Sequence, residues 1–306
     1  MKLSVIVPVY NVEKTLERCV KSIISQHIRD YEVLLINDCS TDNSGAICDQ
    51  LAKEYRHIRV IHGKENKGIS EVRNLGLRKS HGQHIMFVDS DDYLTQDTLS
   101  ELITLVTVHP DYDVLEFPAY LYYGSKKVRR LQFRNKVYHD MVDYWLDCEA
   151  YQHAYLWNKV FRAGVFRGIE FPKGKVFEDA AMMPAILKNA QTIATTNFGL
   201  YYYCYNPNGI TSTATGEELA CLLEAHLNFL KEHISHTDTT TAAFAKFYAS
   251  ILNVQITVYE QTGKAPELPY MKVKPITIKL KALRILGIKR LCQLFKLIHK
   301  IKPINR

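Results

Sequence analysis

The sequence predicts an α/β protein with a mostly parallel sheet flanked by helices and a helical C-terminal extension. Over the first 110 residues, short runs of β-branched and apolar residues alternate with longer segments that have helical apolar spacing. This alternation is typical of parallel sheets covered by helices on both faces. The 306 residues, of which 47% are hydrophobic, are enough for one large domain or two smaller ones.

The first half is predicted to alternate regularly between strands and helices. In the first helix, Leu16, Cys19, Val20 and Ile23 recur at the spacing of one helical face. The expected order is strand 2–10, helix 11–26, strand 31–40, helix 41–55, strand 56–63, helix 68–81 and strand 83–92. The segment TQDTLSEL then predicts a further helix.

From residue 111 the rhythm changes. Segments 113–123 and 126–133 are predicted strands, 139–151 a helix, 198–213 a strand that leads into a loop, and 217–262 one or two helices. We therefore expect three parts of the chain, 1–110, 111–216 and 217–306, the last with a basic tail.

Charge is distributed unevenly along the chain. The formal net charge is +7, but residues 272–306 hold 11 Lys or Arg and no Asp or Glu, which leaves 28 basic against 32 acidic residues elsewhere. This asymmetry predicts a partner for the tail and argues against a general affinity for nucleic acid.

The cellular compartment is predicted from cysteine usage and from the lack of targeting patterns. The seven cysteines include no CxxC pair, the first residues lack a secretory pattern, and no uninterrupted apolar run reaches membrane-spanning length. We expect a cytoplasmic protein in a reducing compartment, with peripheral membrane contact at most.

Polar residues follow each of the four predicted parallel strands. They are Asn11, Asp38, the pair Asn66 and Lys67, and the cluster Asp89 to Asp92. Ligands of open α/β sheets gather at the carboxyl ends of the strands, so these side chains predict a binding site at one edge.

Asp89 and Asp91 form an Asp-x-Asp at the end of the fourth strand. Carboxylates at positions i and i+2 of an extended segment point the same way. Hard oxygen ligands together with substrate phosphates suit Mg²⁺ or Mn²⁺. The alternative is an Asp-rich turn that caps the following helix.

Four ordered motifs carry a family resemblance over roughly the first 100 residues: SVIVPVYN, VLLINDCSTDNS, NKGISEVRNLGL and GQHIMFVDSDDYL. FEDAAM and WNK extend it to about residue 215. Together they resemble the inverting glycosyltransferases of family 2, bacterial polysaccharide-biosynthesis type, which have the Rossmann-like GT-A fold. The resemblance makes 1–110 the nucleotide-sugar-binding half, 111–216 the acceptor-binding and catalytic-base half, and 217–306 the helical extension.

The resemblance assigns the nucleotide-sugar pocket to Pro8, Tyr10, Asp38, Arg73, Asp89 and Asp91. It places Tyr10 against the base, Asp38 at uracil N3, Asp89 at the ribose and Asp91 on the metal. An acceptor for a base N–H favours a UDP-sugar donor. The alternatives are a helix cap for Asp38, a core-edge aromatic for Tyr10 and a solvated helix residue for Arg73.

In the second half the resemblance makes Asp179 of FEDAAM the base that deprotonates the acceptor hydroxyl, and Glu178 the residue that orients the acceptor or the base. Acidic residues that merely favour the helix dipole are the alternative. Trp157 and Lys159 of WNK resemble residues on the acceptor side, with Lys159 near phosphate or simply at the surface.

One position departs from the family pattern. Where relatives often have Tyr-x-Tyr-Arg, this chain reads Tyr201, Tyr202, Tyr203, Cys204. His153, Thr211 and Lys159 are the candidates to replace the arginine, and nothing in the sequence chooses among them.

The basic tail predicts an amphipathic helix. Leu291, Leu294, Phe295 and Ile298 follow the spacing of one face, and lysines and arginines supply charge. Such a helix can lie on an anionic membrane, here the inner face of the cell membrane. The alternative is a helix packed on the body with solvated lysines.

The resemblance implies transfer of a sugar to a saccharide or lipid-linked acceptor in cell-surface polysaccharide synthesis. A binding protein that kept the nucleotide-sugar pocket but lost turnover is the alternative function. Nucleotidyltransferases, P-loop enzymes and serine hydrolases are disfavoured because their Gly-rich loops or Gly-x-Ser-x-Gly elbow are missing from the sequence.

Overall fold

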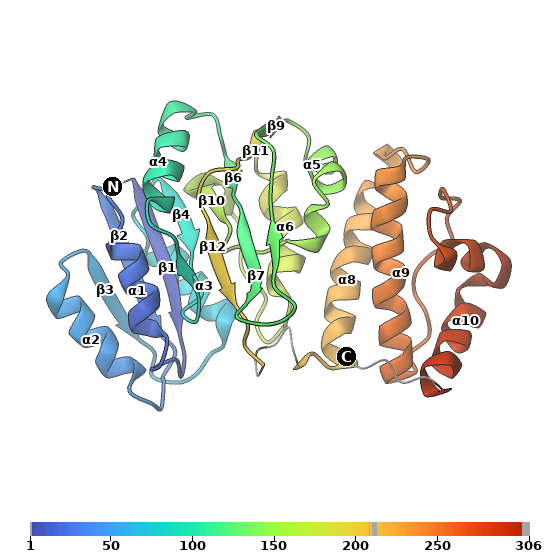
Figure 1. Ribbon diagram of the computed structural model, residues 1–306, viewed down its shortest axis with the longest axis horizontal. Coiled ribbons are helices and arrows are strands. Elements are labelled where there is room, and N and C mark those ends of the chain that lie inside the picture. The colour runs from blue at the N-terminus through green and yellow to red at the C-terminus, as the bar shows by residue number, and fades with distance from the viewer. Residues whose placement is uncertain (1, 208, 210–212, 302–306) are drawn as a thin grey trace. The chain divides into compact units, whose positions relative to one another are not determined.

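In the computed structural model, the chain forms two compact units, whose elements are traced in Figure 1. The first comprises Met1–Met141, Tyr155–Gly174 and Ala185–Pro207, and the second Val142–Ala154, Lys175–Pro184 and Asn208–Arg306. The structure describes residues 2–207, 209 and 213–301. The boundaries of these two units differ from those of the three predicted functional segments, 1–110, 111–216 and 217–306. The functional division remains a prediction.

The first unit is built on an eight-stranded sheet of order β3-β2-β1-β4-β10-β6-β11-β9. Its bounds are β1 Leu3–Val9, β2 Tyr31–Asn37, β3 Ile58–His62, β4 His84–Phe87, β6 Val114–Glu116, β9 Lys136–Tyr138, β10 Lys159–Arg162 and β11 Ile193–Thr195. Strands β1 to β4 pair in parallel, β10 runs antiparallel to both of its neighbours, and β9 runs antiparallel to β11. The predicted mostly parallel sheet is confirmed.

Helices cover this sheet, and this covering is the reason why its central strands are apolar. All residues of β1 and β2 are buried, as expected for strands with both faces covered. The helices are α1 Leu16–Ile24, α2 Ser44–Glu54, α3 Ile69–Lys79 and α4 Thr98–Val108, with a short 3₁₀ turn at Ala163–Phe166. The face of α1 predicted from its spacing is the buried one.

A second, four-stranded sheet of order β5-β12-β7-β8 belongs to the same unit. Its strands are β5 Tyr93–Leu94, β7 Ala119–Tyr123, β8 Arg129–Leu131 and β12 Tyr201–Cys204. Because β5 directly follows the Asp89–Asp92 cluster and pairs with β12, this sheet brings the Tyr-rich segment to the acidic residues.

The second unit is helical. It contains most of α5 (Met141–Asp147), 3₁₀ turns at Ala150–Gln152 and Ile234–His236, the start of α6 (Glu178–Lys188), and the helices α8 Gly216–His233, α9 Ala242–Thr262 and α10 Ile278–Ile301. Thr215 and Glu218 form a capping box at the start of α8, and Gly263 ends α9 in the left-handed conformation.

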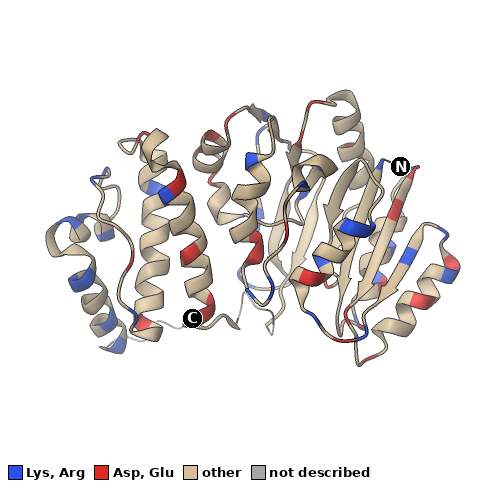
Figure 2. Cartoon of the chain, turned by 180° about the vertical axis from the view of Figure 1, so that it is seen from behind, with Lys and Arg blue, Asp and Glu red and all other residues tan. Residues whose placement is uncertain are grey.

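Helix α10 carries the basic tail, and Figure 2 shows its lysines and arginines in blue. The helical conformation is interrupted at Gly287, which has φ 71° and ψ 165°. Leu291, expected on a membrane-facing stripe, is fully buried, whereas Leu294 is 40% exposed. Among the described residues, no helix is both long and apolar enough to cross a membrane.

Candidate active site

The acidic cluster forms a tight turn between β4 and β5. The backbone N–H of Asp92 donates to the carbonyl of Asp89 at 3.0 Å. Asp89 and Asp91 are partly exposed, but Asp92 is fully buried. The carboxylates of Asp89 and Asp91 therefore reach the surface, while that of Asp92 lies in the interior and holds the turn in place.

Asp92 is held by the strand that carries the tyrosines. Its carboxylate accepts from the Tyr201 hydroxyl at 2.9 Å and from the Cys204 backbone N–H at 2.7 Å. The Tyr201 oxygen also accepts from the backbone N–H of Asp89, at 3.0 Å. Burial, and then the charges of Asp91 and Asp89, raise the pKa of Asp92 well above its ordinary value.

Arg73 of α3 faces this turn. Its Nη2 atom lies 3.6 Å from Oδ1 of Asp89, and its side chain is only 7% exposed. The guanidinium also lies 5.9 Å from the ring centroids of Phe87 and Phe171. The alternative of a solvated helix residue is therefore wrong, and Arg73 is a buried cation beside the acidic turn.

Asp38 follows β2, which is adjacent to β1 in the sheet, and it is buried. Its oxygens accept from the backbone N–H groups of Lys67 at 2.9 Å and Gly68 at 2.8 Å. It does not cap α2, whose N-cap residue is Asn43. A carboxylate offers about four acceptor positions, so Asp38 can accept a further N–H.

Pro8 and Tyr10 lie at the end of β1. Pro8 pairs with Ile36 of β2, and the pairing of β1 with β4 ends at Ile6, before the proline that has no N–H to donate. Tyr10 is 47% exposed, which excludes the alternative of a core-edge aromatic. Its ring is accessible to a ligand.

The four predicted polar positions thus gather at one edge of the sheet, where the parallel strands β1, β2, β3 and β4 end side by side. Asp89 and Asp91 offer hard oxygen ligands there, and Mg²⁺ or Mn²⁺ fits such a donor set. The Asn206 amide donates to Oδ2 of Asp91 at 3.3 Å and orients that carboxylate.

Two predicted acceptor-side residues lie in the interior. Trp157 is 4% exposed and stacks on Tyr201 and Tyr155 at centroid distances of 4.5 and 4.6 Å. Lys159 is fully buried, with Nζ 2.7 Å from Oε1 of Glu116. Glu116 supplies the counter-charge that a buried ammonium needs. The alternative of a surface lysine is therefore wrong, and a contact of Lys159 with phosphate stays a prediction.

Glu178 and Asp179 open α6 and belong to the second unit. Oδ1 of Asp179 accepts from the backbone N–H of Ala180 at 2.7 Å, while Glu178 is buried. Their roles as orienting residue and base stay predictions.

The structure brings a different arginine to position 204. Nη2 of Arg18, in the first turn of α1, donates to the carbonyl of Asp91 at 2.6 Å and to Sγ of Cys204 at 3.5 Å. Burial raises the pKa of the Cys204 thiol to about 11. Of the three candidates expected to compensate, Lys159 is buried, His153 belongs to the second unit and Thr211 lies outside the described residues.

Sequence reasoning missed Arg18 and Tyr201 as parts of this site, and it included Asp92 in the acidic cluster without predicting that Asp92 is buried. Arg18 could have been found from its place in the helix after β1, since that helix begins at the same sheet edge. Tyr201 had no such signal, because 109 residues separate it from Asp92.

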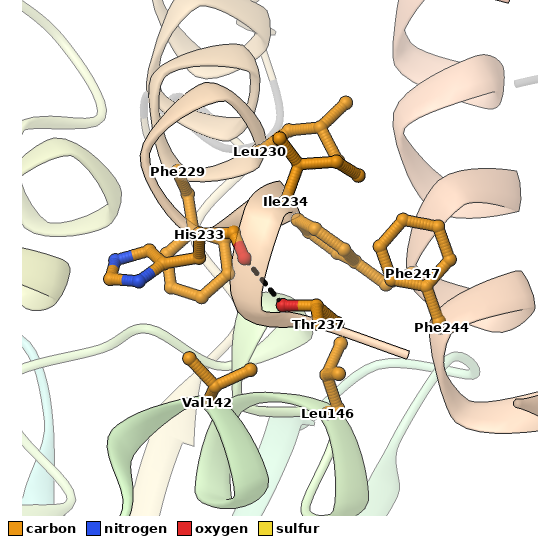
Figure 3. Close-up of a pocket in the computed structure, with 9 residues that line it drawn as sticks. All are labelled: Val142, Leu146, Phe229, Leu230, His233, Ile234, Thr237, Phe244 and Phe247. Atoms are coloured by element: carbon orange, nitrogen blue, oxygen red, sulfur yellow. Dashed lines mark hydrogen bonds between the residues drawn. The ribbon is translucent and has the colours of Figure 1, made fainter. Parts of the chain in front are cut away.

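An apolar pocket in the second unit has a different character (Figure 3). Its lining residues are Val142, Leu146, Phe229, Leu230, His233, Ile234, Thr237, Phe244 and Phe247. The Thr237 hydroxyl donates to the His233 carbonyl at 2.7 Å. With no carboxylate in its wall, the pocket lacks the chemistry of the acidic edge.

Known proteins were compared with this chain. The family model described as Glycosyl transferase family 2 matches residues 4–173. Glycosyltransferase GlyA of Streptococcus pneumoniae serotype 4 is 29% identical over 236 residues, which are 73% of this chain and 33% of GlyA. The uncharacterized glycosyltransferase EpsJ of Bacillus subtilis is 31% identical over 220 residues, 68% of this chain and 62% of EpsJ. The chain therefore spans a third to somewhat under two thirds of the length of these relatives.

Two solved structures share the fold. S. aureus TarS 1-349 in complex with UDP-GlcNAc matches with a TM-score of 0.67 and 20% identity, over 100% of this chain and 93% of that chain. Mannosyltransferase PcManGT from Pyrobaculum calidifontis, in complex with GDP-Man and Mn2+, matches with a TM-score of 0.58 and 14% identity, over 98% and 87%. The expected GT-A fold is confirmed.

Proposed function

The chain belongs to glycosyl transferase family 2, and we propose that it transfers a sugar from a UDP-sugar to a saccharide or lipid-linked acceptor, with inversion, in cell-surface polysaccharide synthesis. The observation that carries this proposal is the sheet edge where Asp38, Arg73 and the Asp89–Asp92 turn meet. A pocket for a base beside carboxylates for a metal suits a nucleotide diphosphate.

The reaction is a single displacement. The acceptor hydroxyl oxygen forms a bond to the anomeric carbon as the bond from that carbon to the donor phosphate breaks, and the electron pair leaves with the diphosphate. Asp179 takes the acceptor proton. Attack from the face opposite the leaving group inverts the anomeric centre.

Asp91 and Asp89 would hold a divalent ion, Mg²⁺ or Mn²⁺. When bound, such an ion neutralises charge on the departing diphosphate. Arg73, held beside Asp89 with its Nη2 atom 3.6 Å from Oδ1, orients this carboxylate and offsets part of its charge. Glu178 orients the acceptor or the base.

Uracil is the base we assign to the donor, because Asp38 is an acceptor and uracil presents an N–H. Tyr10, exposed at the end of β1, lies against the base. The UDP-GlcNAc complex of TarS supports this choice, whereas PcManGT binds GDP-Man. Donor choice is therefore the first property to measure.

We assign the basic helix α10 as the contact of the enzyme with the inner face of the cell membrane. Its charges favour anionic lipid, and its exposed apolar residues include Ile285 at 81% and Leu297 at 58%. A lipid-linked acceptor would be met at this surface, and the cytoplasm supplies the nucleotide sugar.

A panel of nucleotide sugars with Mg²⁺ or Mn²⁺, scored for protection against unfolding and for nucleotide release, tests the function. We expect UDP-sugars to protect and to be turned over only with metal. Preference for a guanosine carrier would overturn the assignment of Asp38, and release without metal would overturn that of Asp91.

The variant Asp179→Asn separates an enzyme from a protein that only binds nucleotide sugar. We expect this variant to bind UDP and metal normally and to lose transfer by roughly a thousandfold or more, since general-base catalysis contributes about that much. Normal transfer by Asp179→Asn would remove it as the base. Binding without turnover by the unchanged chain would favour the binding-protein alternative.

A further inference from the structure

We propose that Arg18, on α1, binds the diphosphate of the donor and supplies there the positive charge that Cys204 does not. The inference rests on the proposed function, because it assigns one more contact to the same donor. It concerns a residue outside the motifs of the sequence analysis.

The charge at the turn creates a need for such a cation. Asp89 and Asp91 reach the surface there, and a nucleotide diphosphate adds further negative charge. A divalent ion offsets only part of this total. Arg73 is already beside Asp89 with its side chain 7% exposed, so a second cation would serve the phosphates.

Arg18 is positioned for this contact by neutral partners. Its Nη2 atom donates to the Asp91 carbonyl at 2.6 Å and to Cys204 Sγ at 3.5 Å. Its guanidinium lies 4.8 Å from the Tyr93 ring centroid. Among the described residues, no carboxylate lies within ion-pair distance of Arg18, so no ion pair within the protein neutralises its charge.

The side chain is also accessible. Arg18 is exposed, and Nη2 alone makes its hydrogen bonds, which leaves the remaining N–H groups of the guanidinium for a ligand. Planar guanidinium groups suit phosphate oxygens because two parallel N–H donors can bind them at once.

An array of tyrosines keeps Arg18 in place and provides a control. Tyr93 stacks on Tyr202 at 4.6 Å, and Tyr202 stacks on Tyr120 at 5.4 Å. At the other end of the array, the guanidinium of Arg130 lies 5.7 Å from the ring centroid of Tyr120. Arg18 and Arg130 thus make the same ring contact, but only Arg18 touches the acidic turn.

The experiment compares UDP with uridine in the presence of Mn²⁺, using calorimetry for UDP and NMR titration for the weaker uridine. We expect Arg18→Ala to weaken UDP binding by about tenfold to a hundredfold, the usual effect of losing a charged hydrogen bond. Uridine affinity should not change. Arg130→Ala, which removes the matched arginine, should leave both affinities unchanged.

A charge-relocation variant tests the link to position 204. In Arg18→Ala/Cys204→Arg, we expect UDP affinity to recover by about tenfold over Arg18→Ala, since a guanidinium returns to the same place. If UDP affinity did not recover, the claim that Arg18 supplies the positive charge missing at position 204 would be wrong.

Other outcomes would overturn the proposal in distinguishable ways. Unchanged UDP affinity in Arg18→Ala would remove the phosphate contact. An equal loss for uridine and UDP would show that Arg18 supports the uridine pocket and makes no phosphate contact. A loss of UDP affinity that is seen with Mn²⁺ and disappears without it would show that Arg18 only holds the Asp91 turn in place. If the unchanged chain failed to bind UDP at all, the proposed function itself would fall, and this inference with it.

Discussion

The hydroxyl of Tyr201 joins the two ends of the acidic turn. It accepts from the Asp89 backbone and donates to the Asp92 carboxylate, at 3.0 and 2.9 Å. Because Asp92 is fully buried, its position is fixed by these bonds and not by water. The geometry of the two exposed carboxylates thus depends on a residue from β12.

We expect Tyr201→Phe to lower the free energy of unfolding by about 1–3 kcal/mol, because buried Oδ2 of Asp92 loses the hydrogen bond from the hydroxyl and the Asp89 backbone N–H loses its bond to the hydroxyl oxygen. Urea unfolding followed by fluorescence measures this change. Tyr202→Phe is the control, since no hydrogen bond of the Tyr202 hydroxyl occurs among the described residues. Equal stability of the two variants would show that the hydroxyl link is not needed.

At the residue scale, the sequence predicts those site residues that directly follow a predicted strand. Asp38 and Asp89 were expected because each follows a strand, and Arg73 was expected from the family resemblance of its motif. Arg18 and Tyr201 were not, because their roles depend on contacts across 73 and 109 residues. Burial of Lys159 against Glu116 is likewise a property of packing, which local sequence does not contain.

Helices and strands were predictable where the apolar pattern continues over many residues. The strands β1 to β4 and their helices follow the expected order. The two-residue β5 and the antiparallel placement of β10 were not predicted, because short strands acquire their partners from the fold. The break at Gly287 was not predicted, because the apolar spacing that indicates a helix in the tail begins only after it, at Leu291.

Gly76 shows how closely α3 approaches the sheet. A methyl group added there would lie 2.5 Å from Cγ2 of Ile6, which belongs to β1. Real Cβ atoms do not approach this closely, so α3 or β1 would have to move. The helix that carries Arg73 therefore depends on a glycine for its distance from β1.

We expect Gly76→Ala to destabilise the protein by about 1–3 kcal/mol, although alanine is the better helix former, because overpacking of a core outweighs propensity. Thermal unfolding measures the effect. Gly164→Ala is the control, since its added methyl meets nothing within 4 Å and its φ is not in the left-handed region. A stability gain in Gly76→Ala would show that β1 and α3 separate easily.

On the scale of the whole molecule, the basic residues are concentrated in one stretch of the sequence, whereas each compact unit is assembled from several separate stretches. The second unit gathers residues from three stretches of chain, which the composition did not indicate. The 11 cations without an acid in residues 272–306 were visible at once. Packing of α10 modifies that prediction, because Leu291 and Cys292 are buried and cannot also face lipid.

The membrane contact proposed for α10 would therefore use exposed apolar residues beside cations. Ile278 and Ile285 are 84% and 81% exposed, and Lys281 and Arg284 lie between them and are also exposed. An isoleucine that enters the interface gains about 1.5–3 kcal/mol, and each nearby cation adds about 1 kcal/mol on anionic lipid.

We expect Ile285→Glu to weaken binding to phosphatidylserine-containing vesicles by about tenfold or more, because it removes apolar area and adds a repelled charge. Co-sedimentation at low and high salt measures this, and binding should fall as salt screens the cations. Val108→Glu is the matched control, since Val108 at the end of α4 is 67% exposed and distant in sequence from the basic tail. Equal losses in both variants would indicate a general charge effect, and vesicle binding that is unchanged by Ile285→Glu would remove α10 as the membrane contact.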